Sequence, residues 1–235
     1  MSVTDLFVFD DAADLADQIA RRLELFVSEG HDNELNIVLT GGTIATRAYQ
    51  QIRADAAEWS SVHWWWGDER YVPEGHADRN DQQAQDAFLN RIGAAADHVH
   101  AMPAHGCADS MKDAAEHYGA TLPAEAFDLV LLGVGPDGHI ASLFPGFDQL
   151  VDTERPCVEV FGSPKPPAER ITLTLPRLNN AREVWFLASG SEKAPAVAHA
   201  VTGRTTVAET PASAVKGLDR TAWLLDEPAA AHLTR

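Results

Sequence analysis

A carboxylate and an imidazole lie two residues apart in a glycine-rich turn, at Asp137 and His139. The turn follows residues 127–132, an almost uninterrupted apolar run that is typical of a strand buried on both faces of a parallel sheet. In such sheets the ligand crevice lies beyond the carboxyl ends of the strands. We therefore expect chemistry at this turn, and an Asp-x-His pair suits proton transfer.

The glycines of the turn, Gly133, Gly135 and Gly138, also spell the G-x-G-x-x-G pattern of dinucleotide-binding proteins. That pattern requires a long helix that begins at the third glycine. Pro145 ends any helix here after barely two turns, because proline removes a backbone donor and clashes with the preceding turn. A nicotinamide cofactor is therefore not expected.

A second glycine turn follows the β-rich run at residues 35–39. Gly41, Gly42 and Thr43 precede a helical pattern, and this order leaves free backbone N–H groups at a helix N-terminus. Such an N-terminus binds anions such as phosphate. A plain tight turn with Thr43 as the helix N-cap explains the same residues equally well.

Charged residues follow two further buried runs and begin a third. Asp68 and Arg70 come directly after the tryptophan-rich run at residues 62–66, Lys193 follows a later run, and Arg170 begins another strand. Charges at such positions are costly unless they are paired or catalytic, and an exposed ion-pair cluster is the alternative. Because the carboxyl ends of parallel strands gather on one rim, we expect these side chains to share a crevice, where arginine and lysine suit a phosphate.

Three histidines, His98, His100 and His105, are close enough in the sequence to suggest a metal site, and the first two alternate as on one strand face. No cysteine or carboxylate at ligand spacing accompanies them. Cys107 and Cys157 form neither a disulfide framework nor a pair of metal ligands, and we interpret them as reduced packing residues. We therefore expect no metal.

Alternating strand and helix patterns position these residues. Strand-like runs occur at residues 6–9, 35–39, 62–66, 127–132, 158–161, 170–175, 184–188 and 222–225. Their alternation with helical patterns predicts an α/β fold, a doubly wound and mainly parallel sheet with helices on both faces. At 235 residues the chain fits a single domain, 1–235, and a monomer is the expected state, with a dimer as the alternative.

The composition limits the partners. Asp and Glu total 35 against 18 for Lys and Arg, a formal net charge of -17, which argues against nucleic acid and anionic membrane surfaces. We find no signal peptide, long apolar span or lipidation motif, and expect a cytoplasmic protein. Together with the glycine turns and the Asp-x-His pair, these features predict an enzyme that acts on a small phosphorylated molecule.

Five segments together resemble the 6-phosphogluconolactonase family, in order and over nearly the whole chain. They are LTGGT at 39–43, GDERYVP at 67–73, LGVGPDGHIASLFPG at 132–146, PPAERITLT at 166–174 and GSEK at 190–193. Each segment is weak evidence alone, but the set is specific. The family more often has serine where this chain has Thr43, and the hydroxyl is kept.

The resemblance implies a glucosamine-6-phosphate deaminase-like fold and the hydrolysis of 6-phospho-D-glucono-1,5-lactone to 6-phospho-D-gluconate, the second step of the oxidative pentose phosphate pathway. It implies that His139 is the general base that takes a proton from water, that Asp137 orients either the site or the histidine, and that Asp68 holds substrate hydroxyls. No metal or organic cofactor is implied. The implied phosphate ligands are Gly41, Gly42, Thr43, Arg170 and Lys193, with Arg70 close by.

Two alternatives share parts of this pattern. Glucosamine-6-phosphate deaminases are similar in the glycine turn and in Asp-Gly-His, but they use an acidic residue in a Phe-Asn-Glu-Pro stretch soon afterwards. Residues 142–145 of this chain are SLFP and offer no carboxylate. A sugar-phosphate sensor of a transcription regulator would carry a helix-turn-helix, for which we expect no room before Leu6 or after Leu233, and the acidic charge disfavours DNA.

Overall fold

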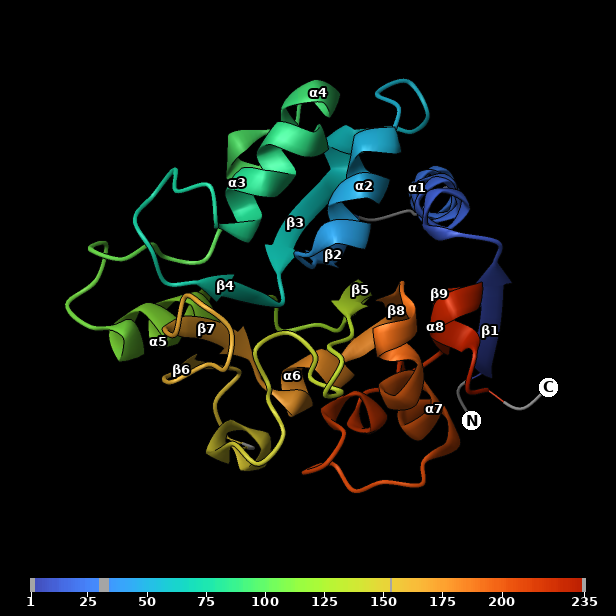
Figure 1. The fold of residues 1–235 in the computed structure, drawn as a ribbon. Coiled ribbons are helices and arrows are strands. Elements are labelled where there is room, and N and C mark those ends of the chain that lie inside the picture. The colour runs from blue at the N-terminus through green and yellow to red at the C-terminus, as the bar shows by residue number, and fades with distance from the viewer. Residues whose placement is uncertain (1–2, 30–33, 153, 234–235) are drawn as a thin grey trace.

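Most strands form one parallel sheet in the computed structural model, which describes residues 3–29, 34–152 and 154–233 (Figure 1). The sheet has six strands in the order β1-β9-β8-β5-β2-β3, and every neighbouring pair is parallel. The predicted mainly parallel sheet is thereby confirmed. The bounds of its strands are β1 Val3–Phe9, β2 Leu35–Leu39, β3 Val62–Trp66, β5 Phe127–Gly133, β8 Ala181–Ala188 and β9 Arg220–Asp226.

Helices cover both faces of this sheet, with α1 and α2 on one face and α7 on the other (Figure 1). The longest, α1, buries Leu15, Ile19 and Leu23 at helical spacing, and Asp11 caps it by accepting two backbone N–H bonds. The bounds of the helices are α1 Ala12–Ser28, α2 Thr43–Gln51, α3 Asn80–Ala84, α4 Asn90–Ile92, α5 Met111–Thr121, α6 Leu175–Asn179, α7 Ala194–Thr202 and α8 Glu227–Ala230.

Short helical turns complete the secondary structure. A π-helical turn, η2, joins α3 to α4, and the remaining turns have 3-10 geometry. None of the helices within the described ranges is long and apolar enough to cross a membrane. The short turns are η1 Trp59–Ser61, η2 Gln85–Leu89, η3 Ala96–His98, η4 Asp148–Val151, η5 Ser191–Lys193 and η6 Pro211–Ala214.

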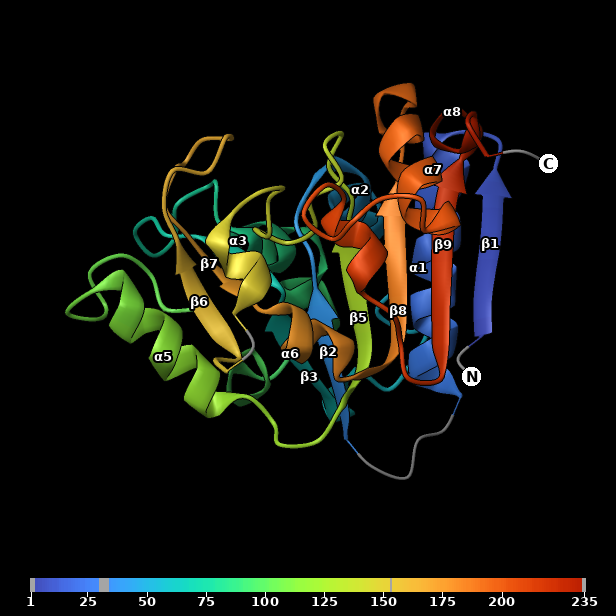
Figure 2. The ribbon, with the colours of Figure 1, turned by 90° about the horizontal axis from the view of Figure 1, so that it is seen from below.

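A second sheet, with three antiparallel strands, lies beside the first (Figure 2). Its order is β4-β7-β6, with bounds β4 Asp68–Arg70, β7 Arg170–Leu173 and β6 Cys157–Val160. The expectation that Arg170 begins a strand is confirmed, because β7 starts at Arg170, but this strand belongs to the small antiparallel sheet and not to the main parallel one. A short apolar run does not reveal the direction or identity of its partner strand, and here β7 pairs with β4.

The pairing of β7 with β4 still brings Arg170 to the expected rim. Arg170 lies opposite Arg70 in the β4–β7 register, and β4 follows β3 after the single residue Gly67. The second sheet thus continues from the carboxyl end of the first, and contributes residues to the same place.

Hydrogen bonds also join the carboxyl ends of β2 and β5 inside the main sheet. The amide of Gly133 donates to Thr40 Oγ1 at 3.3 Å, and the Tyr49 hydroxyl donates to the Thr40 carbonyl at 3.0 Å. Both Thr40 and Tyr49 are buried. The glycine turn after β2 is therefore held against the turn after β5.

Candidate active site

A cavity of about 540 Å³ opens at the carboxyl ends of β2, β5 and β8 and reaches the second sheet. Eight of the nine predicted site residues line it, and the ninth, Asp137, contacts the lining residue His139. The lining residues used below are Gly41, Gly42, Thr43, Arg47, Asp68, Arg70, Asn80, Gly135, His139, Ala141, Lys165, Arg170, Glu192 and Lys193.

His139 and Asp137 form a hydrogen-bonded pair. Asp137 Oδ1 contacts His139 Nδ1 directly and also accepts the His139 backbone N–H at 3.3 Å. Burial opposes ionisation of Asp137, but the hydrogen bond and the charge of His139 outweigh it and lower the pKa of Asp137 to about 2. An ionised Asp137 can only accept, so it fixes the proton on Nδ1 and leaves the lone pair of a neutral imidazole on Nε2.

The backbone of the turn gives the imidazole its position. Gly138 has φ of +81°, and the Gly135 amide donates to the His139 carbonyl at 2.8 Å. A Cβ added at Gly135 would lie 2.0 Å from His139 Nδ1, so the ring rests where only glycine leaves room. Ala141 has a left-handed φ of 48°, which is strained for a residue with a side chain and is typical of functional sites.

The N-terminus of a helix and several cationic side chains line the same cavity. Gly42, with φ of +102°, is the N-cap of α2, so the first amides of that helix have no intrahelical partner and could bind an anion. Five cationic side chains line the cavity against two carboxylates, Asp68 and Glu192. The cations are Arg47, Arg70, Lys165, Arg170 and Lys193.

The side chains of Arg170 and Lys193, two of the predicted phosphate ligands, are partly buried. Burial lowers the pKa of Arg170, and Asp68 opposes that shift. Burial and the nearby charge of Lys165 lower the pKa of Lys193, while Glu192 and Asp137 oppose the shift. A partly buried cationic side chain with few neighbouring carboxylates gains most from an anionic ligand, because the ligand supplies the missing negative charge.

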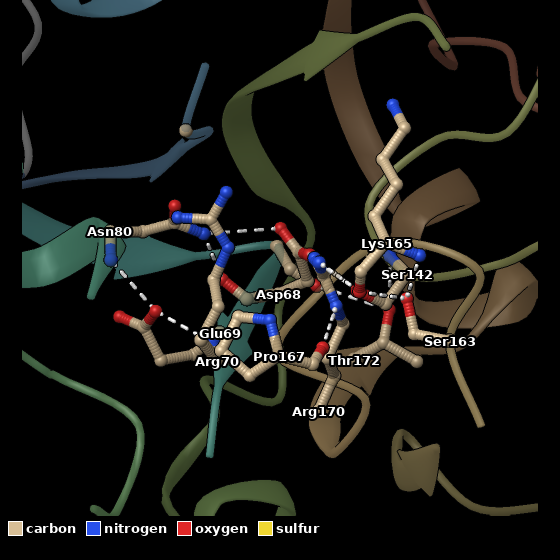
Figure 3. A network of polar contacts seen from close by, with 12 residues as sticks. Asp68, Glu69, Arg70, Asn80, Ser142, Ser163, Lys165, Pro167, Arg170 and Thr172 are labelled. Carbon is tan, nitrogen blue, oxygen red and sulfur yellow. Dashed lines mark hydrogen bonds and ion pairs between the residues drawn. The ribbon is translucent and has the colours of Figure 1, made fainter. Parts of the chain in front are cut away.

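Asp68 lies at the centre of a buried polar network (Figure 3). Its Oδ2 accepts the Ser142 hydroxyl at 2.6 Å and lies 3.8 Å from Arg170 Nη1. Asn80 Nδ2 donates to the Asp68 carbonyl at 2.8 Å and lies 3.3 Å from Oδ1. The network fixes the carboxylate at the cavity wall, where its remaining acceptor capacity suits hydroxyl groups.

A second buried cluster, formed by Glu69, Arg79 and Asp81, lies next to the network around Asp68. Glu69 accepts the backbone N–H groups of Arg70, Asn80 and Asp81 at 2.7–2.9 Å and thereby holds the start of α3 against β4. Burial raises the pKa of Glu69, and Arg79 at 3.9 Å opposes this. Arg79 is itself buried and donates to Asp81 at 2.7 Å.

Three polar residues that line the cavity, Arg47, Asn80 and Lys165, were not predicted as site residues. Arg47 lies one helical turn after Thr43, so the helical period points to it. Asn80 is the first residue of the short helix α3, and Lys165 lies in a loop; nothing in the sequence indicates that either reaches this cavity. Ser142, which donates to Asp68 without lining the cavity, was also not predicted.

The fold and the cavity define an α/β protein in which a hydrogen-bonded Asp–His pair lies at a cavity lined by five cationic side chains. The chain belongs to the family described as glucosamine-6-phosphate isomerases/6-phosphogluconolactonase, which matches residues 10–223. It is 42% identical to the 6-phosphogluconolactonase of Streptomyces coelicolor over 98% of this chain and 95% of that protein. It is 47% identical to that of Mycobacterium tuberculosis over 84% of both chains.

Solved structures agree with this assignment. The 6-phosphogluconolactonase of Trypanosoma brucei superposes with a TM-score of 0.86 at 26% identity, and the match covers 100% of each chain. The predicted family and the predicted deaminase-like, mainly parallel fold are therefore confirmed.

Proposed function

We propose that this chain hydrolyses 6-phospho-D-glucono-1,5-lactone to 6-phospho-D-gluconate, the second step of the oxidative pentose phosphate pathway. The family and the relatives above support this reaction. The mechanism rests on one observation: His139, which is hydrogen-bonded to Asp137, lines a cavity whose wall also carries five cationic side chains. The proposal treats residues 1–235 as one domain and places the enzyme in the cytoplasm.

In the proposed mechanism His139 is the general base. Nε2 forms no hydrogen bond with the residues that the structure describes, and it takes a proton from the water that attacks the lactone carbonyl carbon. The carboxylate of Asp137 stabilises the imidazolium that forms. When the tetrahedral intermediate collapses, the imidazolium returns the proton to the ring oxygen as the ester bond breaks.

The remaining side chains hold the substrate. The amides of Gly41, Gly42 and Thr43 and the cations around them bind the phosphate, and Asp68 binds sugar hydroxyls. An anchored phosphate fixes the distance between the lactone carbonyl and His139, which lowers the entropic part of the barrier. We expect no metal in this mechanism, so treatment with EDTA should leave turnover unchanged.

The test is turnover of freshly generated lactone, coupled to 6-phosphogluconate dehydrogenase and followed by NADPH, with spontaneous hydrolysis subtracted. We expect His139→Ala to lower kcat by about 10²–10⁴-fold, the usual contribution of a general base. The matched control is His232→Ala, which removes an exposed histidine outside the cavity.

Activity that survives His139→Ala would move the base elsewhere and leave the reaction in place. A wild-type protein without turnover above background would overturn the proposed function. Glucosamine 6-phosphate would then be the next substrate, because the deaminases share this fold family.

A further inference from the structure

A second group of chemically active side chains lies near the amino-terminal ends of β2 and β3, away from the carboxyl ends that line the cavity. Glu34, His63 and His98 present a carboxylate oxygen and two imidazole nitrogens that all lie within 4.8 Å of one another. Two imidazoles and a carboxylate are the ligand types that zinc and its neighbours among the transition metals prefer. The cluster lies outside the cavity described above.

The strand register explains why the two histidines meet. Trp64 of β3 forms a parallel bridge with Val99, and the His100 amide donates to the Trp64 carbonyl at 2.9 Å. His98, the last residue of the 3-10 turn η3, directly precedes Val99, as His63 directly precedes Trp64, so the bridge brings the two histidines next to each other. Their rings stack with centroids 4.0 Å apart.

Glu34, the residue immediately before β2, joins these histidines. Asn36 pairs with His63 in the β2–β3 register, and Glu34 lies two residues before Asn36, hence on the same side. Its Oε2 is 3.2 Å from His63 Nε2. A tetrahedral metal with bonds of about 2.1 Å spaces its ligand atoms about 3.4 Å apart, so this pair already has the required separation.

The other nitrogen of His63 has a partner that orients the ring. His63 Nδ1 lies 2.8 Å from His100 Nε2, and the His100 ring stacks on Trp65 with centroids 3.8 Å apart. Histidines that bind metals commonly donate their second ring N–H to a neighbour in this way, which leaves Nε2 free for the metal.

One ring nitrogen of the cluster has no protein partner, and the carboxylate of the cluster has no cationic partner of fixed charge. His98 Nδ1 is buried and has no hydrogen bond in the part of the chain that the structure describes. Within the same part, the exposed carboxylate of Glu34 pairs with His63, and no lysine or arginine neutralises it. A buried ring nitrogen without a partner is costly, and a cation bound to it and to Glu34 would satisfy the nitrogen and neutralise the carboxylate.

We infer that Glu34, His63 and His98 bind one divalent transition metal ion, with Zn²⁺ the best match and water as the fourth ligand. His63 lies five residues before Asp68 along β3 and β4, about 16 Å at strand spacing, so this metal would not touch the substrate. It would instead tie β2, β3 and the segment around His98 together.

The cluster contains only one of the three neighbouring histidines, His98, His100 and His105, that suggested a metal site in the sequence. His105 is not part of the cluster, because its amide donates to the Val72 carbonyl and its ring packs against Tyr71. The other ligands come from segments distant in sequence, Glu34 before β2 and His63 within β3, which no ligand-spacing pattern detects.

The experiment uses untagged full-length protein stripped with EDTA and titrated with Zn²⁺ in a calorimeter, with Co²⁺ absorption as the probe of tetrahedral geometry. We expect one Zn²⁺ per chain and a visible Co²⁺ band. Glu34→Gln and His98→Gln should each weaken Zn²⁺ binding at least ten-fold, a loss that is reached even when only a group hydrogen-bonded to a metal ligand is removed. The matched control His232→Gln should bind as the wild type does.

Saturating Zn²⁺ should also raise Tm by about 5 °C in the wild type and leave Tm unchanged in Glu34→Gln. Glu34 is 66% exposed, so this variant keeps the fold even where His98→Gln does not. No Zn²⁺ binding, or equal affinity in the wild type and Glu34→Gln, would overturn the inference. Lactone turnover should be the same in all these proteins, so failure here is distinct from failure of the proposed function.

Discussion

Asp137 decides which ring nitrogen of His139 carries the lone pair. The ionised carboxylate accepts the Nδ1 proton, whereas the amide of Asp137→Asn can donate to Nδ1 and favour a proton on Nε2. We expect Asp137→Asn to lower kcat by about 10²–10⁴-fold with little change in KM. The coupled lactone assay measures both, and a change confined to KM would contradict this role.

The same substitution has a pH-dependent effect on stability. The pKa of Asp137 falls from 3.8 to about 2 on folding, so its ionised form stabilises the folded protein above pH 4, and this contribution is lost as pH falls towards 2. The side chain is 41% exposed, so solvent screening reduces the contribution at pH 7 to about 1 kcal/mol. Urea unfolding of the wild type and Asp137→Asn at pH 7 measures it.

Gly135 offers a steric test of the same site. In Gly135→Ala the new Cβ would lie 2.0 Å from His139 Nδ1 and 2.6 Å from Asp137 Oδ1, so the pair must move. We expect turnover to fall at least 10²-fold, because a shift of about 1 Å in a catalytic group costs that much.

The matched control for this test is Gly67→Ala. Its Cβ would find its closest contact at 3.6 Å, an ordinary van der Waals distance. This variant should keep most of the turnover. Equal losses at the two glycines would show that general disruption, not displacement of His139, causes the effect.

At the scale of elements, the junction between β4 and α3 depends on buried charges. Arg79 is 1% exposed and lies between Glu69 and Asp81. Arg79→Met keeps the volume but leaves two buried carboxylates without their cation, and we expect it to lower the free energy of unfolding by about 3 kcal/mol. Urea unfolding at pH 7 measures this loss.

An exposed ion pair provides the comparison. Arg21 lies one helical turn after Asp17 on α1, and both side chains are largely exposed. Arg21→Met should cost less than about 0.5 kcal/mol. A similar cost at Arg79 would mean that water reaches the Glu69 cluster.

The elements of the parallel sheet could be predicted because each has a strong local signal. The runs at residues 35–39 and 62–66 match β2 and β3, and the glycine turns after β2 and β5 lie at the cavity as expected. The second sheet could not be predicted. β4 has only three residues, and whether β7 pairs in parallel or antiparallel depends on a partner far away in the chain.

The site residues divide in the same way, into those that a local sequence pattern marks and those that only tertiary packing brings to the cavity. His139 and Asp137 belong to one turn, so their contact could be inferred from the sequence. Asn80 and Lys165 reach the cavity only through tertiary packing, and no local pattern marks them. The roles assigned to all of these residues stay predictions until the variants are measured.

At the scale of the whole molecule, a net charge of -17 contrasts with the cations of the cavity. The Debye length at 0.15 M salt is about 8 Å, so distant carboxylates are screened, and we expect the cationic side chains of the cavity to determine the proposed phosphate binding. We expect Lys193→Glu to lower kcat/KM by at least ten-fold, on the scale of a charge-assisted hydrogen bond. Lys112→Glu, an equal charge reversal on α5, should change it less than two-fold. Equal losses of kcat/KM in the two variants would contradict the view that the cationic side chains of the cavity determine substrate binding.

The cavity wall includes Gly41 and His139, from turns that follow β2 and β5 of the parallel sheet, and Asp68 and Arg170, from the antiparallel sheet. These residues are distant in sequence, and loops of that length close slowly during folding. A chain that held only the parallel sheet would have no complete pocket, because Asp68 and Arg170 would be missing from its wall. Recovered turnover after refolding therefore reports that both sheets are assembled, which a signal from the tryptophans of β3 alone does not report.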